Sequence, residues 1–92
     1  MTVEVRIPSM LQKFTNGEKL LSYSDPATVG DVLSSIDADH PGIGNQLFED
    51  GELRRFVNIF LNDEDIRFIK QMDTELNDGD VLAILPALAG GS

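Results

Sequence analysis

The end of the chain, Leu85-Pro86-Ala87-Leu88-Ala89-Gly90-Gly91-Ser92, holds the residues whose spacing first suggests chemistry. Two adjacent glycines stand one residue before the last position, where no turn requires them. Glycine has no Cβ atom, so a Gly-Gly thread can pass a narrow channel that other residues would block. The pair is therefore either a frayed end or the tip of a tail that enters another protein.

Side chains suited to catalysis are few in the rest of the sequence. The chain has no Cys, which excludes a disulfide, a thiolate zinc site and a cysteine nucleophile. His40 is the single histidine, and no matched Ser and Asp stand near it. The acidic run Asn62-Asp63-Glu64-Asp65 lacks the glycine and the final Glu of an EF-hand loop, so it predicts a solvated turn. We expect no resident metal or cofactor.

The charge balance limits the classes of partner. Sixteen acidic residues against seven basic ones give a net charge of -9 over 92 residues. Such a chain repels phosphate backbones and anionic lipid surfaces, so neither nucleic acid nor a membrane is an expected partner. The acidic residues indicate either a partner with a basic surface or a surface charge that only keeps the protein soluble. No leader and no apolar run of roughly 20 residues is present, so we expect a cytoplasmic protein.

The elements that must position the tail follow from the hydrophobic pattern. Alternating apolar residues predict a strand at 2–8, and strand-forming residues predict a weaker strand at 18–23 and further strands at 54–62 and 66–69. Residues 81–85 are apolar on both sides and predict a last, central strand. Turns are predicted at Asn16-Gly17, Asn62-Asp63 and 77–80.

One amphipathic helix stands between the second and third strands. Thr28 is a predicted N-cap, and the helix ends at His40-Pro41-Gly42. Its apolar residues follow helical spacing; they are Val29, Val32, Leu33 and Ile36. A short helical turn at 43–48 and a loop at 49–51 follow it.

This order predicts an α+β protein with one main helix packed on one face of a mixed sheet of four or five strands. It is the order of the β-grasp, or ubiquitin-like, fold, with residues 1–87 as a single domain and 88–92 as a flexible tail. The first and last strands are expected to lie parallel at the sheet centre, so the tail leaves a rigid strand. In strand 54–62, Val57, Ile59 and Leu61 are predicted to face the helix, and Phe56 and Phe60 the opposite side.

Together with the terminal Leu85–Gly91 stretch, this order resembles the ubiquitin-like sulfur carriers. These include the thiamine carrier, the small subunit of molybdopterin synthase and the carrier of thiocarboxylate-dependent cysteine synthesis. Residues 55–68, RFVNIFLNDEDIRF, and 7–11, IPSML, most resemble the cysteine-synthesis branch. The resemblance covers nearly the whole chain, and the long middle motif is more specific than a bare Gly-Gly.

The resemblance implies that the chain is a substrate and not an enzyme. An E1-like ATP-dependent activating enzyme would adenylate the carboxylate of Gly91, and a sulfur donor would convert the adenylate to a thiocarboxylate. Leu88, Ala89 and Gly90 would form the tail inside partner active sites. A synthase dependent on pyridoxal phosphate (PLP) would accept the sulfur, and a JAMM-type zinc metalloprotease would release the product amino acid. All cofactors would belong to the partners.

Ser92 departs from the family pattern, because mature carriers end at the second glycine. With Ser92 attached, the Gly91 carboxylate is part of a peptide bond and cannot be adenylated. The resemblance suggests a precursor that the JAMM-type protease activates by cleaving after Gly91. An introduced residue, or a change that blocks activation, is an equally open interpretation.

Phe56 and Phe60 are candidate docking residues for a partner, because exposed aromatic residues on a sheet are good interface anchors. Alternatively, the segment at 43–53 covers them. Two other functions stay open: the small subunit of molybdopterin synthase and a ubiquitin-like protein modifier. The final sulfur acceptor, whether cysteine, homocysteine, a siderophore or another metabolite, is not encoded in this chain.

Overall fold

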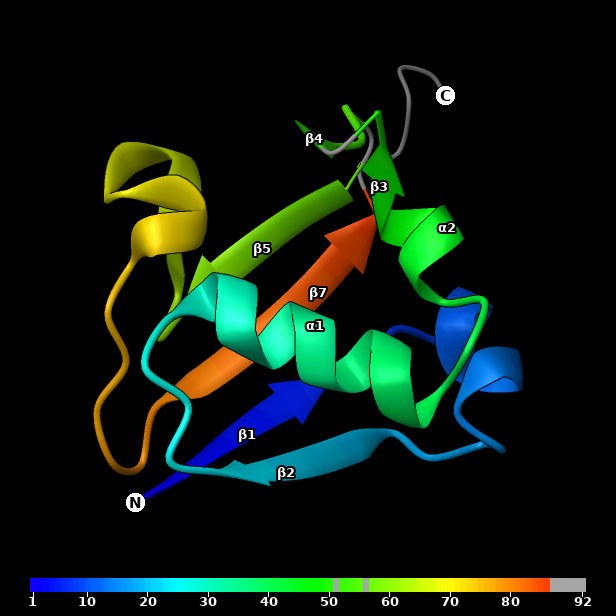
Figure 1. The fold of residues 1–92 in the computed structure, drawn as a ribbon, viewed down its shortest axis with the longest axis horizontal. Helices are drawn as coiled ribbons and strands as arrows, with labels where there is room; N and C mark the ends of the chain where they lie inside the picture. The colour runs from blue at the N-terminus through cyan, green and yellow to red at the C-terminus, as the bar shows by residue number, and fades with distance from the viewer. Residues whose placement is uncertain (51, 56, 87–92) are drawn as a thin grey trace.

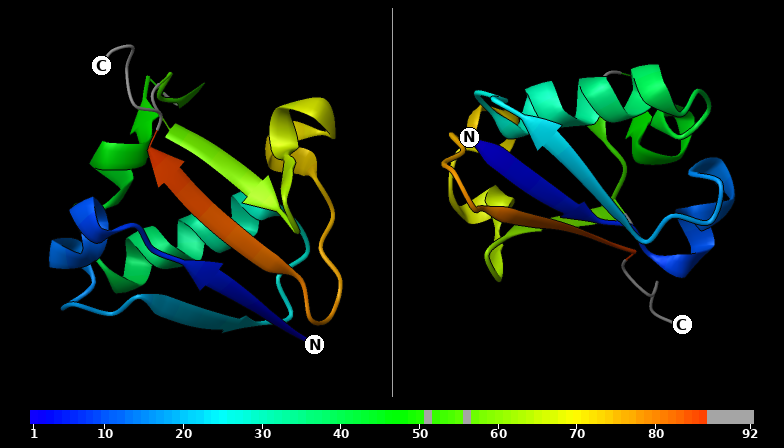
Figure 2. Two further views of the ribbon diagram at one scale, coloured as in Figure 1. Left: turned by 180° about the vertical axis from the view of Figure 1, so that it is seen from behind. Right: turned by 90° about the horizontal axis from the view of Figure 1, so that it is seen from below.

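The computed structural model of the protein describes residues 1–50, 52–55 and 57–86 (Figure 1). Five strands form one sheet in the order β2-β1-β7-β5-β6. The strands are β1 (Thr2–Arg6), β2 (Leu20–Ser24), β5 (Val57–Leu61), β6 (Glu64–Asp65) and β7 (Val81–Pro86). Helix α1 (Val29–Asp39) lies across one face of the sheet (Figure 2). The predicted α+β class and β-grasp order are confirmed.

Strand β7 occupies the centre of the sheet, as predicted. It runs parallel to β1, with Val5 opposite Leu82, and antiparallel to β5, with Ile59 opposite Ile84. The outer strands β2 and β6 are each antiparallel to their neighbours. A strand paired on both sides is held along its whole length, so the point where β7 ends is a fixed point of the fold.

Helix α1 begins where Thr28 and Asp31 form a capping box. The Asp31 N–H donates to Thr28 Oγ1 at 3.3 Å, and the Thr28 N–H donates to Asp31 Oδ2 at 3.2 Å. These bonds satisfy amide groups that have no partner inside the helix. The predicted N-cap is confirmed, and His40 is the residue that ends the helix.

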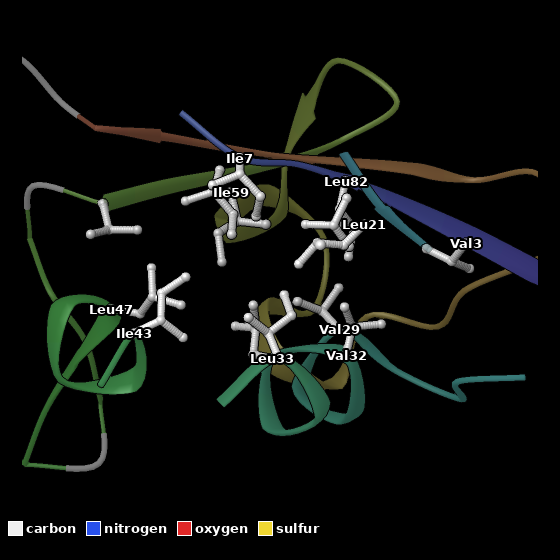
Figure 3. Packing of buried hydrophobic residues seen from close by; sticks show 14 of the residues in the cluster. Val3, Ile7, Leu21, Val29, Val32, Leu33, Ile43, Leu47, Ile59 and Leu82 are labelled. Atoms are coloured by element: carbon white, nitrogen blue, oxygen red, sulfur yellow. The ribbon is translucent and has the colours of Figure 1, made fainter. Parts of the chain in front are cut away.

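The core lies between α1 and the sheet (Figure 3). Val3, Leu21, Ile59 and Leu82 come from strands and point toward the helix. The four predicted apolar residues of α1 meet them and are at most 1% exposed: Val29, Val32, Leu33 and Ile36. The period of the sequence pattern therefore identified the buried face of the helix correctly.

Shorter elements close the core at its ends. They are the 3-10 helix η1 (Ser9–Phe14), helix α2 (Gly44–Leu47), the strands β3 (Phe48–Glu49) and β4 (Glu52–Leu53), and the 3-10 helices η2 (Ile66–Phe68) and η3 (Gln71–Asp73). Helix α2 confirms the turn predicted at 43–48. Of the loop predicted at 49–51, Glu49 belongs to β3, Asp50 has a positive φ of 55°, and position 51 lies outside the described residues. Strands β3 and β4 pair as a small second sheet.

The strand predicted at 66–69 is wrong, because this segment forms η2. Asn62 and Asp63 have positive φ angles of 49° and 74°, so the chain reverses within two residues and β6 pairs at once with β5. The Asp65 carboxylate then accepts a hydrogen bond from the Arg67 N–H at 2.9 Å, which bends the chain away. The solvated turn predicted for the acidic run is confirmed at Asn62 and Asp63, which are both exposed.

Other predicted strand boundaries also shift. Strand β1, predicted at 2–8, ends at Arg6, because Pro8 precedes η1. Strand β2 starts at Leu20, two residues later than predicted, and β5 starts at Val57. The turn at Asn16-Gly17 exists, with φ angles of 56° and 84°, but η1 separates it from β1. No helix in the described part of the chain is both long and apolar enough to cross a membrane.

Candidate functional site

The base of the tail, at the end of β7, is the part of the predicted tail site that the structure describes. Strand β7 ends at Pro86, which lies opposite Val57 at the start of β5. Within the strand, Leu82 and Ile84 are at most 1% exposed and anchor it in the core. Two buried side chains so close to the exit fix the position and direction from which the chain continues. The tail candidates Leu88, Ala89, Gly90, Gly91 and Ser92 lie outside the described residues.

On the face of the sheet away from α1, every second residue of three neighbouring strands presents its side chain. Arg6, Ala83 and Phe60 come from β1, β7 and β5 and are joined by the register, with Ala83 opposite both of the others. Their chain neighbours Val5, Leu82 and Ile59 are buried on the helix side. We call this surface the open face; Val81 and Leu85 of β7 and Leu20 of β2 lie on it too.

Phe60 lies on the open face, so the predicted face is confirmed. It is half-buried, and together with Arg6, Val81 and Ala83 it lines a hollow of about 230 Å³. The segment at 43–53 does not line this hollow. Its residues Ile43 and Leu47 are fully buried in the core instead. The other candidate, Phe56, lies outside the described residues.

Two exposed leucines widen the apolar part of the open face. Leu20 is 47% exposed and Leu85 is 45% exposed. The sequence analysis did not select them, although Leu85 alternates with the buried Ile84 and Leu82 in the same way that Phe60 alternates with Ile59. An apolar surface beside the tail can receive the apolar surface of a partner that also holds the tail.

A larger hollow of about 410 Å³ lies between β4 and the η2–η3 turns. It is lined by Glu52, Leu53, Ile66, Arg67, Gln71 and Met72. None of these is a residue that the sequence analysis selected, and the open face does not contribute to it. The hydrophobic patterns of residues 52–53 and 66–72 are too short to predict that these two segments pack together.

The fold clearly changes the titration of Tyr23. Burial, followed by the neighbouring Asp39 carboxylate, raises the pKa of Tyr23 to about 12. The hydroxyl therefore stays protonated at neutral pH and has no role as a base. Among the described residues, no group of three or more His, Cys, Asp and Glu is placed to hold a metal ion. The described part of the chain thus presents the base of the tail and a partly apolar open face.

Comparisons with known proteins agree with this arrangement. The ThiS family model matches residues 5–91. The sulfur carrier protein CysO of Mycobacterium tuberculosis is 46% identical over 94 residues, which cover 99% of this chain and 100% of the relative. Small archaeal modifier protein 3 of Haloferax volcanii is 37% identical, with the same 99% and 100% covered.

A solved structure extends the likeness to the fold. A chain in the crystal structure of the Amycolatopsis orientalis BexX/CysO complex superimposes with a TM-score of 0.88 and 43% identity, over 97% of this chain and 99% of that one. Relatives of this kind are small carriers that are not themselves enzymes. The chain belongs to the ThiS family and is a ubiquitin-like sulfur carrier protein.

Proposed function

We propose that Gly91 carries sulfur as a terminal thiocarboxylate, for the synthesis of cysteine, homocysteine or a related sulfur metabolite. In the first step the Gly91 carboxylate attacks the α-phosphorus of ATP in an E1-like enzyme, and pyrophosphate leaves. In the second step a sulfur nucleophile attacks the acyl carbon, and AMP leaves. The observation that carries the proposal is the family match, which ends at Gly91 and includes both glycines.

The structure supports this role by the way it presents the tail. A carboxylate becomes an acyl donor only inside an active site, and six residues follow the last described residue, Pro86. A thread of that length spans at most about 20 Å when extended. The tail thus enters a partner while the folded domain stays outside, and the open face beside its base is the surface available for docking. Ordering each tail residue costs about 1–2 kcal/mol, which contacts to Leu88 and Phe60 must offset.

Ser92 is proposed to mask the carrier until a JAMM-type metalloprotease removes it. The support is chemical, because the carbonyl carbon of Gly91 is an amide while Ser92 is attached. The family match stops one residue before Ser92. Cleavage by water would leave the carboxylate that the activating enzyme needs.

The test is intact-mass analysis of two proteins, the chain of residues 1–92 and a chain that ends at Gly91. Each is incubated with the activating enzyme, ATP and a sulfide source. We expect the shorter chain to exchange one oxygen for sulfur and to release pyrophosphate, and the full chain to do so only after the protease is added. A chain that ends at Gly90 is the matched control for the position of the reacting glycine. Adenylation with Ser92 retained would refute the mask, and a shorter chain that never gains sulfur would refute the carrier chemistry.

The remaining partners are part of the same proposal. A PLP-dependent synthase would take the sulfur from Gly91, and both reactions are expected in the cytoplasm. The related CysO chain was solved in a complex with a second protein, BexX, which supports action through a protein partner. Mixing the thiocarboxylated chain with candidate synthases and their acceptor substrates, followed by product mass analysis, would identify the acceptor.

A second candidate function is protein modification. It is favoured by the 37% identity, over the full chain, to a small archaeal modifier protein. In that case Gly91 would form an amide with a lysine of another protein. A ladder of heavier species that carry this chain in extracts of its native cells would support modification. Stable copurification with one large subunit would indicate molybdopterin synthase instead.

A further inference from the structure

Arg67 bridges two parts of the chain that meet beside the base of the tail. Its guanidinium Nη2 donates to the carbonyl oxygen of Val57 at 3.0 Å and to that of Arg55 at 3.5 Å. Val57 lies opposite Pro86, the last described residue of β7. Arg67 belongs to η2, ten residues further along the chain than Val57, so the contact is tertiary.

The register shows why the Val57 carbonyl needs this donor. One residue beyond the β5–β7 ladder, the Asn62 N–H donates to the Val81 carbonyl and the Val81 N–H donates to Asn62 Oδ1, so this position carries the hydrogen bonds between the two segments. Hydrogen-bonded positions alternate along antiparallel strands, which makes Val57 and Pro86 a pair without mutual hydrogen bonds. The Val57 carbonyl therefore points to the outer edge of β5. Strand β6 covers that edge only opposite Leu61 and Phe60.

Arg67 thus donates to the Val57 carbonyl the hydrogen bond that a neighbouring strand would provide if β6 were longer. The turn that presents it is fixed at two points, since Ile66 is 1% exposed and the Asp65 carboxylate accepts the Arg67 N–H at 2.9 Å. Hydrogen bonds from a charged donor are stronger than those between neutral groups. The guanidinium also has several N–H groups in one plane and can reach two carbonyls at once.

The bridged segment is also tied down on its other side. The Arg54 N–H donates to the Leu47 carbonyl at 2.8 Å, and Arg54 Nε donates to the Asn45 carbonyl at 3.0 Å. Arg54 is therefore held by α2, and Arg55 and Val57 are held by η2. Val57 in turn lies opposite Pro86, the last described residue of β7.

We propose that Arg67 is a positioning residue for the activating enzyme, an inference that rests on the function proposed above. Its guanidinium holds the carbonyls of Arg55 and Val57, so that the start of β5, the open face to which β5 contributes and the end of β7 at Pro86 keep one relative geometry. Arg67 does not touch the reacting carboxylate. Its loss is expected to weaken binding of the enzyme.

The test compares Arg67→Met, which keeps the aliphatic stem, with Arg67→Lys, which keeps one donor. Lys70→Met is the matched control, because it removes the same charge from an exposed side chain three residues away. Two quantities are measured on the full chain at a temperature where every variant is folded: amide hydrogen exchange at Val57, and the Kd for the activating enzyme. For Arg67→Met we expect both exchange and Kd to rise about tenfold or more, the size of one lost charged hydrogen bond. Arg67→Lys should be intermediate and Lys70→Met unchanged.

Each other outcome is informative. If Arg67→Met exchanges faster at Val57 but binds the enzyme as well as the wild type, Arg67 is a structural residue and the inference is wrong. Equal weakening by Arg67→Met and Lys70→Met would show a charge effect and would also overturn it. If the wild-type chain itself does not bind an activating enzyme, the proposed function fails, and the inference falls with it.

Discussion

Ile59 and Phe60 are neighbours on β5 whose side chains point to opposite faces of the sheet, so replacing each by Ala separates stability from docking. Ile59 is fully buried between the sheet and α1, and Phe60 is half-buried on the open face. We predict that Ile59→Ala lowers the free energy of unfolding without changing the affinity for the activating enzyme. Phe60→Ala should lower the affinity, with a loss of stability no larger than that of Ile59→Ala.

The magnitudes follow from burial. Ile59→Ala removes three carbon atoms from the core, worth about 0.8 kcal/mol each, and the cavity that remains raises the total to about 2–5 kcal/mol. For a domain of this size, each 1 kcal/mol lowers Tm by about 4–8 °C, so a fall of about 8–40 °C is expected. Phe60 loses roughly half of a full Phe→Ala cost, about 2 kcal/mol. If Phe60 is a binding hot spot, its removal also costs at least about 2 kcal/mol of binding, close to a 30-fold rise in Kd.

The assay is calorimetric titration of the activating enzyme with each variant, at a temperature below the Tm of both. Thermal unfolding followed by circular dichroism gives the stability of the same samples. The reasoning would be refuted if Ile59→Ala weakened binding as much as Phe60→Ala, because the loss would then reflect general loosening of the domain. An unchanged Kd for Phe60→Ala would show that the open face does not dock the enzyme.

Three further predictions test the local structure. Thr28→Ala removes the side-chain half of the capping box and should destabilise the protein by about 1 kcal/mol in denaturant unfolding; Thr28→Ser, which keeps the acceptor, is its control. Gly44→Ala would place a Cβ against the Asp37 carboxylate and disturb the bond that the Gly44 N–H donates to it, so its cost should shrink in an Asp37→Ala background. An equal cost in both backgrounds would contradict the contact. Tyr23 binds its proton more tightly in the folded state, so stability should fall as pH rises from about 10 to 12; because Tyr23 is the single tyrosine, phenolate absorbance reports its titration directly, and Tyr23→Phe should remove this part of the pH dependence.

Long-period patterns made most of the fold predictable. The alternation in β1, the continuous apolar run of β7 and the helical spacing of Val29, Val32, Leu33 and Ile36 each extend over five or more residues. A pattern of that length indicates the type of element and, where it alternates or follows helical spacing, the face that is buried. The prediction failed at 66–69, where Ile66 and Ile69 suggested a strand. The turn at Asn62 and Asp63, and the hydrogen bond that the Asp65 carboxylate accepts from the Arg67 N–H, make this segment a 3-10 helix instead.

The docking surface was predictable only in part. Phe60 was placed on the correct face because strand alternation is a local property. The contribution of Arg6, Ala83 and Leu20 to the same face depends on which strands are neighbours and in which register. The bond between Arg67 and Val57 likewise depends on where β6 ends, which no local pattern states.

The amino-acid sequence by itself determined the elements, the identity of the central strand and the chemistry available to the tail, since a Gly-Gly thread and the absence of Cys are properties of the chain alone. Only the tertiary structure decided how the tail is presented. Pairing of β7 with both β1 and β5 holds its exit in place, and the surrounding side chains become one surface because residues distant in sequence meet there. Local patterns record which side chains need burial, whereas a surface for a partner is made by contacts between segments that have no sequence relation to one another.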